Sequence, residues 1–419
     1  MFALTRWIVL WEGFTDKLKF KVSPYHQRKE KRMFRSLSKY VKNSFARFDK
    51  PILILSMLIT LMSLVTIFSA RANFGLSKLI MQLAMTVVGI CAITIMVNID
   101  YRIFVERYWA ILLVVSIALL GITLVFGDTG ANGTETTNRS WLTIVNIGGK
   151  AFQIQPSEFV KIAFIISFSK HLSSVKKEIN KIKTLLLLGL HAGAIVGLIF
   201  LSGDLGVALV YIGIIAIMLA FAGLSKWYFI GAGIVVVLAF PFLWPFLSSY
   251  QQNRILIGFQ PELDPTNFGY QPLLSLKAIS SGGIFGRGMN SGGYYEDLPA
   301  SHTDFIFSTY CEMFGFIGAI IFIIVLFSLV VRIINIGKNS KNEFGKFICI
   351  GIAAMFIVQS MMNLGMCLAM FPVIGITLPF MSYGGSSMLA LYIAMGFVHA
   401  ISAHDKGIKR KKKIQNDKR

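Results

Sequence analysis

Long apolar runs without charged residues dominate the chain and predict membrane-spanning helices, each of which needs about 20 mostly apolar residues. Such charge-free runs cover 51–70, 79–99, 108–127, 184–203, 205–225, 227–253 and 313–331. A longer run, 347–404, has no Asp, Glu, Lys or Arg. Its centre holds Pro372, Gly375, Pro379 and Gly384–Gly385, which divide it into two helices.

The distribution of Lys and Arg predicts which side of the membrane each connection faces. Segment 157–171 is shorter and carries Lys161, but its neighbours need a span there for consistent sidedness. With residues 1–50 inside, the connections on that side hold 33 of the 41 Lys and Arg residues. The sequence therefore predicts an all-α polytopic membrane protein of about ten transmembrane helices with both termini cytoplasmic.

The predicted spans divide the chain into an arm, a membrane domain and a tail. Residues 1–50 hold 13 Lys and Arg residues and are expected to form a basic, amphipathic cytoplasmic arm on the membrane surface. The membrane domain, 51–402, includes two long outer loops, 128–156 and 249–304. Residues 403–419 form a basic cytoplasmic tail. Long ordered loops tend to be functional, so a site is expected beside the outer ones.

Composition narrows the class of protein. Charged residues make up 15% of the chain against roughly a quarter in soluble domains, and the mean hydropathy of +0.67 excludes a disordered chain. A net charge of +21 in so apolar a chain indicates cations at a membrane surface, so no nucleic-acid partner is expected. The four cysteines lie in apolar stretches without metal-ligand spacing, which predicts neither disulfides nor zinc.

Four acids stand at or inside predicted span boundaries: Glu158, Asp204, Asp304 and Glu312. Ionisable groups are costly there and are functional candidates by default. Asp304 is either a helix N-cap, as Ser301 or Thr303 could also be, or a general base that takes a proton from a sugar hydroxyl. A helix N-terminus is expected to lower its pKa. His302 is expected to pack or hydrogen-bond rather than to ligate a metal.

Other outer residues suit an anionic ligand. A predicted span begins with Gln155-Pro156-Ser157-Glu158, and free backbone N–H groups at the start of a helix favour binding of a phosphate. In the alternative interpretation, Glu158 has a structural role and either caps the helix or balances the charge of Lys161. Sparse outer cations suited to clamp an anionic headgroup are Arg139, Lys150, Arg254, Lys277 and Arg287. Gly282–Gly288 is interpreted as a tight turn, not a nucleotide loop, and the hydroxyls around Ser386 as helix packing or a cavity lining.

Five stretches together resemble the SEDS family (shape, elongation, division and sporulation), which includes RodA, FtsW and SpoVE. They appear in family order within 51–402: Gln155–Lys161, Gly203–Gly206, Gly269–Gln271, His302–Phe307 and Leu378–Ser387. The Arg-Trp pair common before the first stretch is split here into Arg139 and Trp141, and the nearby Lys150 is shifted in register. Pro261–Pro265 is similar to the RodA version of its loop.

The resemblance implies a peptidoglycan glycosyltransferase that polymerises lipid II at the outer face of the bacterial plasma membrane, with an elongation role. It places the catalytic aspartate at Asp304. It also implies a divalent cation, Mg²⁺ or Mn²⁺, with unassigned ligands, no organic cofactor, and a class B penicillin-binding protein as partner. The candidate substrate-binding residues are Arg139, Trp141, Lys150, Gln155, Glu158, Lys161, Asp204, His302 and Ser386.

Three alternatives stay open at this point. A lipid II flippase would use the same substrate without making a bond, and a division or sporulation polymerase would make the same bond in another process. An ion-coupled transporter of small solutes is the third. The position of the key acid discriminates, because a transporter needs acids in mid-membrane whereas a polymerase needs one at the outer boundary, as at Asp304.

Overall fold

The computed structural model describes residue 40 and residues 42–128, 138–147 and 150–416, in two units, 1–47 and 48–419. Most of the expected arm, 1–50, lies outside the described residues. In the first unit, 42–47 is helical and the Ser44 hydroxyl donates to the Tyr40 carbonyl oxygen, 2.8 Å away. The second unit holds the membrane domain.

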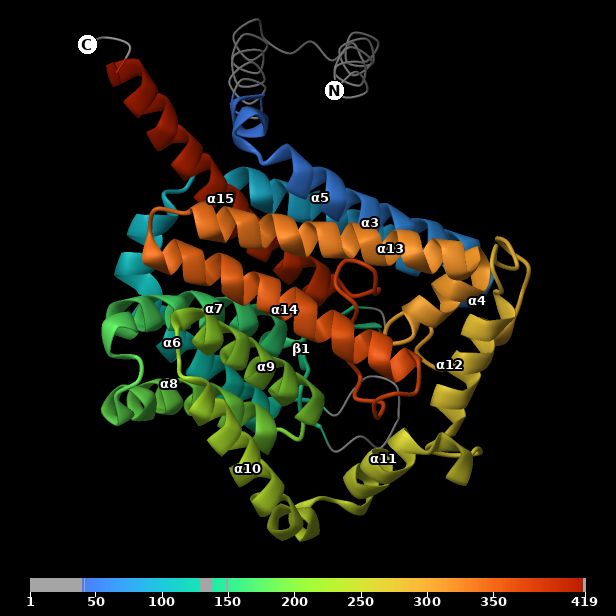
Figure 1. Ribbon diagram of the computed structural model, residues 1–419. Helices are drawn as coiled ribbons and strands as arrows, with labels where there is room; N and C mark the ends of the chain where they lie inside the picture. Colours follow the sequence, from blue (N-terminus) through green and yellow to red (C-terminus); the bar gives the residue numbers. More distant parts are fainter. Residues whose placement is uncertain (1–39, 41, 129–137, 148–149, 417–419) are drawn as a thin grey trace, which may run out of the picture. The chain divides into compact units, whose positions relative to one another are not determined.

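Helices make up nearly all of the second unit (Figure 1). Its long helices are α3 (Lys50–Ser69), α5 (Leu76–Met96), α6 (Tyr101–Phe126), α7 (Pro156–Val175), α8 (Ile182–Leu201), α9 (Leu205–Ala222), α10 (Lys226–Leu243), α13 (Ile306–Asn339), α14 (Glu343–Cys367) and α15 (Gly385–Asn416). Within the described residues, eight are long and apolar enough to cross a membrane. The other two, α7 and α10, stand where the sequence predicted spans. The all-α polytopic class is confirmed.

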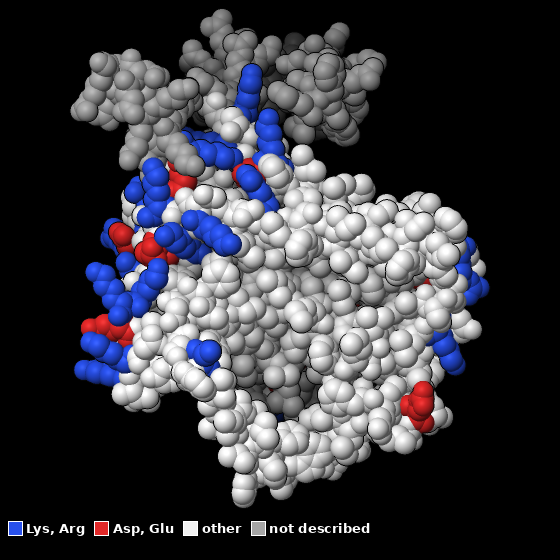
Figure 2. Space-filling model, in the orientation of Figure 1, with Lys and Arg blue, Asp and Glu red and all other residues white. Residues whose placement is uncertain are grey.

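The helices run between two ends of different chemistry. The basic end holds the first residues of α3, α8 and α14 and the last of α13 and α15. The site end holds the first residues of α7, α9 and α13. Lys and Arg gather toward the basic end and are sparse at the site end (Figure 2). This asymmetry matches the charge distribution that the sequence predicted.

Helix α14 lies at the centre of the bundle, packed against α7, α9 and α13, as Figure 1 shows for α9 and α13. A second close contact joins α5 and α15. A Cβ atom at Gly89 would lie 2.1 Å from Cδ2 of Tyr392, so only glycine lets that ring approach α5. The Tyr392 hydroxyl lies 2.9 Å from the Thr60 hydroxyl, which pairs a polar group inside the bundle.

The expected span over 227–253 ends earlier than the charge-free run. Helix α10 ends at Leu243 because Pro241 and Pro245 cannot supply helical N–H donors. A capping box at Ser248 and Gln251 then begins α11 (Ser249–Phe259). None of the described side chains of α10 is buried, as expected for a helix that faces lipid.

The two expected outer loops contain secondary structure. Strands β1 (Leu142–Ile147) and β2 (Lys150–Ile154) pair antiparallel before α7. The second region contains α11, α12 (Tyr270–Ser281) and the short 3-10 helices η3 (Pro261–Leu263) and η4 (Tyr294–Glu296). Near it, α4 (Arg71–Phe74) joins α3 to α5.

Asp49 ties three helices together at the basic end. Its buried carboxylate accepts two hydrogen bonds from Arg332 of α13, at 2.9 and 2.7 Å, and others from Lys406 (3.0 Å) and Ser402 (3.2 Å) of α15. These cations hold the pKa of Asp49 well below its usual range although burial opposes them. Helix α15 continues through the expected tail to Asn416, so the tail does not begin as a separate segment at 403.

Candidate functional site

Asp304 lies in a turn over residues 300–305 that precedes α13. The N–H groups of Thr303 and Phe305 both donate to the Ala300 carbonyl oxygen, at 3.0 and 3.1 Å. Ala300 adopts a positive φ of 54°, which is uncommon for a residue with a side chain. The turn is therefore held by its own backbone and by the Thr303 hydroxyl, which donates to the same Ala300 oxygen at 3.2 Å.

Three consecutive carbonyl oxygens of this turn accept hydrogen bonds from other segments. The His302 oxygen accepts from the Tyr383 N–H at 2.9 Å, and the Thr303 oxygen accepts from the Ser382 hydroxyl at 2.6 Å. The Asp304 oxygen accepts from Nδ2 of Asn363 at 2.7 Å. The segment before α15 and the end of α14 thus fix the backbone of the turn, while the Asp304 side chain is only partly buried.

The two sequence-based alternatives for Asp304 can now be compared. Helix α13 begins at Ile306, and its N-cap position is Phe305, with no side-chain capping bond. The capping alternative for Ser301, Thr303 and Asp304 is therefore wrong. The carboxylate is instead surrounded by protein, with solvent on one side.

The expectation of a lowered pKa at Asp304 is also wrong. Burial raises the pKa of Asp304 to about 6, the positive charge of Arg254 opposes this, and the negative charge of Asp204 adds to it. Desolvation outweighs any effect of the helix end, because a carboxylate enclosed by protein loses much of its hydration. Asp304 is thus ionised at neutral pH and still basic enough to accept a proton.

His302, beside it, is a packing residue. Its ring lies 5.3 Å from the Phe74 ring and 5.7 Å from the Tyr383 ring, measured between centroids. Burial, and then the charge of Lys78, lowers the pKa of His302 to about 4. The imidazole is therefore neutral at physiological pH.

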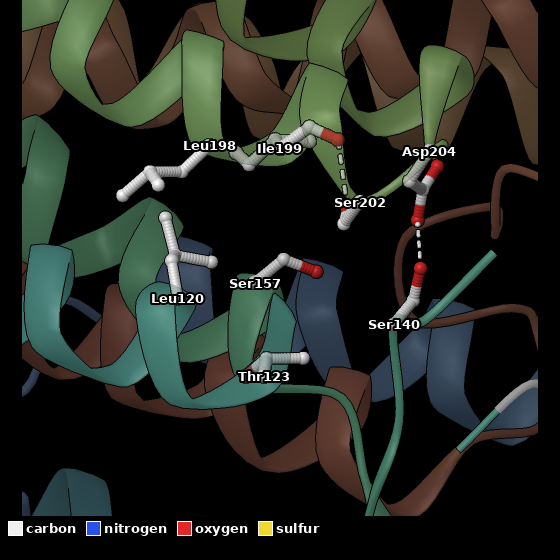
Figure 3. Close-up of a pocket in the computed structure, with 8 residues that line it drawn as sticks. All are labelled: Leu120, Thr123, Ser140, Ser157, Leu198, Ile199, Ser202 and Asp204. Atoms are coloured by element: carbon white, nitrogen blue, oxygen red, sulfur yellow. Dashed lines mark hydrogen bonds between the residues drawn. The ribbon is translucent and has the colours of Figure 1, made fainter. Parts of the chain in front are cut away.

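A second acid, Asp204, caps α9 (Figure 3). Its Oδ1 accepts from the Val207 N–H at 3.1 Å, and its Oδ2 accepts from the Ser140 hydroxyl at 3.1 Å and from Nε2 of Gln155 at 3.5 Å. Burial raises the pKa of Asp204 although these donors oppose the shift. Asp204 thus joins the segment before β1 to the start of α7 and the start of α9.

A small cavity adjoins Asp204. It is lined by polar groups of Thr123, Ser140, Ser157 and Ser202 and by apolar groups of Leu120, Leu198 and Ile199 (Figure 3). The Ser157 hydroxyl is buried and has no hydrogen-bond partner among the described residues. A volume of about 10 Å³ with these groups suits one water molecule.

Glu158 and Lys161 form a buried ion pair one turn into α7. The Lys161 ammonium lies 2.9 Å from Oε1 of Glu158, and the two side chains are 1% and 8% exposed. Neither charge could remain in this environment alone, because losing one partner leaves an uncompensated buried charge. This geometry agrees with the interpretation that Glu158 balances the charge of Lys161.

The other residues that the sequence analysis selected as substrate-binding candidates lie in several segments near the start of α7 and α9. Ser386 accepts a 3.4 Å bond from the Gln155 N–H, and the Arg139 N–H donates to the Ser202 carbonyl oxygen at 3.1 Å. Trp141 pairs with Asp128 through its backbone. Lys150 begins β2, and its side chain lies outside the described residues. The structure therefore gathers Gln155, Asp204 and Ser386 into one cluster and places Arg139 beside it.

One residue of the site, Asn363, was not selected from the sequence, and the relation of a second, Arg254, to Asp304 was not foreseen. Asn363 is fully buried in α14, and its Nδ2 also donates to the Ile376 carbonyl oxygen at 2.6 Å. The available signal was the group of polar residues, Gln359, Ser360 and Asn363, within a predicted span. Arg254 was noted as a cation, but only the fold brings its charge near Asp304. Figure 2 shows a hollow in this face of the molecule, between α14 and the connection from α10 to α11.

Comparisons with known proteins fit this geometry. The cell cycle protein family of FtsW, RodA and SpoVE matches residues 49–407. The chain is 35% identical to the probable peptidoglycan glycosyltransferase FtsW of Trichlorobacter lovleyi over 376 residues, covering 85% of this chain and 94% of that protein. It is 32% identical to the stage V sporulation protein E of Bacillus subtilis over 371 residues, covering 85% and 98%.

Solved structures share the fold. One, described as the structural coordination of polymerization and crosslinking by a peptidoglycan synthase complex, aligns with a TM-score of 0.72 at 25% identity, covering 85% of this chain and 98% of that chain. The rod shape determining protein RodA of Thermus thermophilus aligns with a TM-score of 0.62 at 24% identity, covering 85% and 96%.

These observations define a multi-pass helical membrane protein with a cluster of acids at one end of the bundle. The chain belongs to the FtsW/RodA/SpoVE cell cycle protein family, which confirms the predicted resemblance.

Proposed function

We propose that this chain is a peptidoglycan glycosyltransferase that polymerises lipid II at the outer face of the bacterial plasma membrane. The observation that carries the proposal is Asp304, a partly buried carboxylate with a pKa of about 6 at the boundary of a spanning helix. General bases work best when their pKa lies near the operating pH. The names of the relatives support the same chemistry.

In the proposed reaction, two lipid-linked disaccharides meet at the site end. Asp304 removes the proton from the GlcNAc 4-hydroxyl of the acceptor, and that oxygen attacks C1 of the donor MurNAc. The bond from C1 to the lipid diphosphate breaks, and attack from the opposite face inverts the anomeric carbon. Arg254, whose charge already reaches Asp304, is placed to attract the diphosphate.

A divalent cation fits this site only in one mode. No cluster of three or more His, Cys, Asp or Glu residues suited to a metal occurs in the described part of the chain. Mg²⁺ commonly takes one or two carboxylates and fills its remaining positions with water and substrate phosphate. Asp304, whose pKa is raised in part by the negative charge of Asp204, is the carboxylate that would hold it, with Asp204 as a second acid whose oxygens already accept bonds from Val207, Ser140 and Gln155. When bound, the cation would neutralise charge on the leaving diphosphate.

The placement of the acids argues against the transport alternatives. Asp204 and Asp304 each precede the first residue of a helix at the site end. A flippase or an ion-coupled transporter would be expected to carry its key acids in mid-membrane. The buried pair of Glu158 and Lys161 also lies near the start of its helix, and it is internally neutralised.

We expect Asp304→Asn to reduce glycan polymerisation by roughly 10²–10⁴-fold, the usual contribution of a general base. The asparagine keeps the shape of the side chain, and the turn is held through backbone atoms, so the fold should survive. Purified protein with lipid II, analysed by gel, measures the loss, and thermal melting checks the fold. A folded variant that polymerises at the wild-type rate would show that Asp304 is not the base.

The pH profile gives an independent test of the same assignment. Because the base acts in its deprotonated form, the polymerisation rate should fall as the pH drops below about 6 and level off above it. Arg254 lowers the pKa of Asp304, so Arg254→Gln should move the midpoint to higher pH. Lys277→Gln removes an exposed charge at the same end and should leave the midpoint in place. Identical midpoints in all three proteins would contradict the assignment.

The proposed partner is a class B penicillin-binding protein that crosslinks the new strands. The support is the fold shared with a structure whose description couples polymerization with crosslinking. We expect the chain to co-purify from native membranes with a penicillin-labelled protein. Repeated recovery of a fully active chain that no candidate transpeptidase affects would contradict this.

The physiological role is the finest part of the proposal. The Pro261–Pro265 sequence favours cell elongation, whereas the relatives carry division and sporulation names. Depletion in the native cell separates these roles by shape. Rounded cells would support elongation, filaments would support division, and normal growth with failed spores would support sporulation.

A further inference from the structure

Helix α13 is interrupted eleven residues after Asp304. Gly315 has φ 65° and ψ −165°, so the helical path stops there and resumes at Phe316. Such an interruption leaves backbone N–H and C=O groups without helical partners. In a spanning helix these groups must find other partners, because the hydrocarbon layer offers none.

The segment 282–288 supplies those partners. Backbone N–H groups of Phe316 and Ile317 donate to the carbonyl oxygens of Gly283 (2.9 Å) and Ile284 (3.2 Å). In the other direction, the N–H groups of Arg287 and Gly288 donate to the carbonyl oxygens of Glu312 (2.9 Å) and Met313 (3.1 Å), respectively. Four backbone hydrogen bonds therefore join this turn to both sides of the interruption.

Glycine is required for that approach. A Cβ atom at Gly286 would lie 2.1 Å from the Met313 carbonyl oxygen, and one at Gly282 would lie 2.1 Å from that of Cys311. The glycines that the sequence analysis interpreted as a tight turn thus let one backbone pass against another.

Glu312, on the last turn before the interruption, holds the next part of the outer segment. Its side chain is 1% exposed. Oε1 accepts from the Ser281 hydroxyl and the Tyr294 N–H, both at 2.9 Å, and more weakly from Arg287 at 3.4 Å. Oε2 accepts from the Tyr295 N–H at 2.9 Å. A buried carboxylate is stable only with such partners.

The residues that Glu312 holds are connected by side-chain packing to the turn 300–305, which contains Asp304. The buried Tyr295 ring packs edge-on against Phe74, with centroids 6.3 Å apart, and Phe74 packs against His302, two residues before Asp304. The short helix over 306–314 gives a second route, since it carries Asp304 before its first residue and Glu312 near its last. Glu312 therefore joins the short helix that follows Asp304, of which it is part, to the segment that holds Ser281, Tyr294 and Tyr295.

We propose that Glu312 is a positioning residue for the polymerisation reaction: it fixes segment 281–296 against the short helix 306–314 and so holds Asp304 in its working geometry. The inference rests on the proposed role of Asp304. It differs from a purely structural role because it requires loss of the turnover rate in a protein that remains folded and binds substrate.

The test uses the full chain in detergent and compares Glu312→Gln, Ser281→Ala, Asp304→Asn and the control Glu262→Gln, which removes an exposed carboxylate on the same side. Three measurements are made: the melting temperature, hydrogen exchange of the amides in 281–296, and steady-state kinetics with lipid II, which give kcat and KM. A small misplacement of a catalytic group costs about 10- to 100-fold in rate. We therefore expect Glu312→Gln to lower kcat by that factor, with KM within about twofold.

Faster exchange at Tyr294 and Tyr295 should accompany that loss in Glu312→Gln. Ser281→Ala removes a single donor and should change kcat and exchange in the same direction by less. Glu262→Gln should match the wild type in all three measurements, and Asp304→Asn should keep wild-type exchange.

Each other outcome overturns the proposal. A folded Glu312→Gln protein with wild-type kcat does so, as does one that loses kcat without faster exchange in 281–296. If Glu312→Gln does not fold, Ser281→Ala decides, and an unchanged kcat there is the contradicting result. Failure of the base assignment is recognised separately, because Asp304→Asn would then polymerise at the wild-type rate in the same assay.

Discussion

Charged groups and free backbone groups inside the bundle are costly unless they pair within the protein, because lipid offers no partner. This constraint explains the most specific contacts of the structure. Asp49 is surrounded by Arg332, Lys406 and Ser402, and Glu158 meets Lys161 within one turn of α7. Where α13 is interrupted, segment 282–288 completes its hydrogen bonds. The contacts of Asp49 and of segment 282–288 also join elements that are distant in sequence, so satisfying the constraint there helps to build the fold.

The site end is organised in the same way, with one difference. The carbonyl oxygens of the turn 302–304 are all occupied by donors from α14 and from the segment before α15. The Asp304 carboxylate is enclosed but has no comparable set of partners, and its pKa rises as a result. A rigid backbone therefore presents a basic side chain, the combination that proton removal from a sugar hydroxyl requires.

The surroundings of the site suit a substrate carried on a lipid. Helix α10 has no buried side chain among those described and ends at prolines, after which α11 continues beside the hollow in Figure 2. An approach along the membrane would deliver a lipid-linked sugar to the same end of the bundle as Asp304.

The sequence by itself determined the spans, the gathering of Lys and Arg at one end of the bundle and the division of 347–404, because the length of apolar runs and the distribution of Lys and Arg are local properties of the chain. It also located Asp304 at a boundary. Only the tertiary structure decided how that acid behaves: Arg254 and Asn363 lie about fifty and sixty residues away in the chain, and the pKa follows from enclosure by segments that no local pattern brings together. Glu312 shows the same limit, since its partners Ser281, Tyr294 and Tyr295 lie 31, 18 and 17 residues away in the chain and meet it only in the folded protein. Pairing between distant groups depends on how helices pack, and apolar patterning does not encode that.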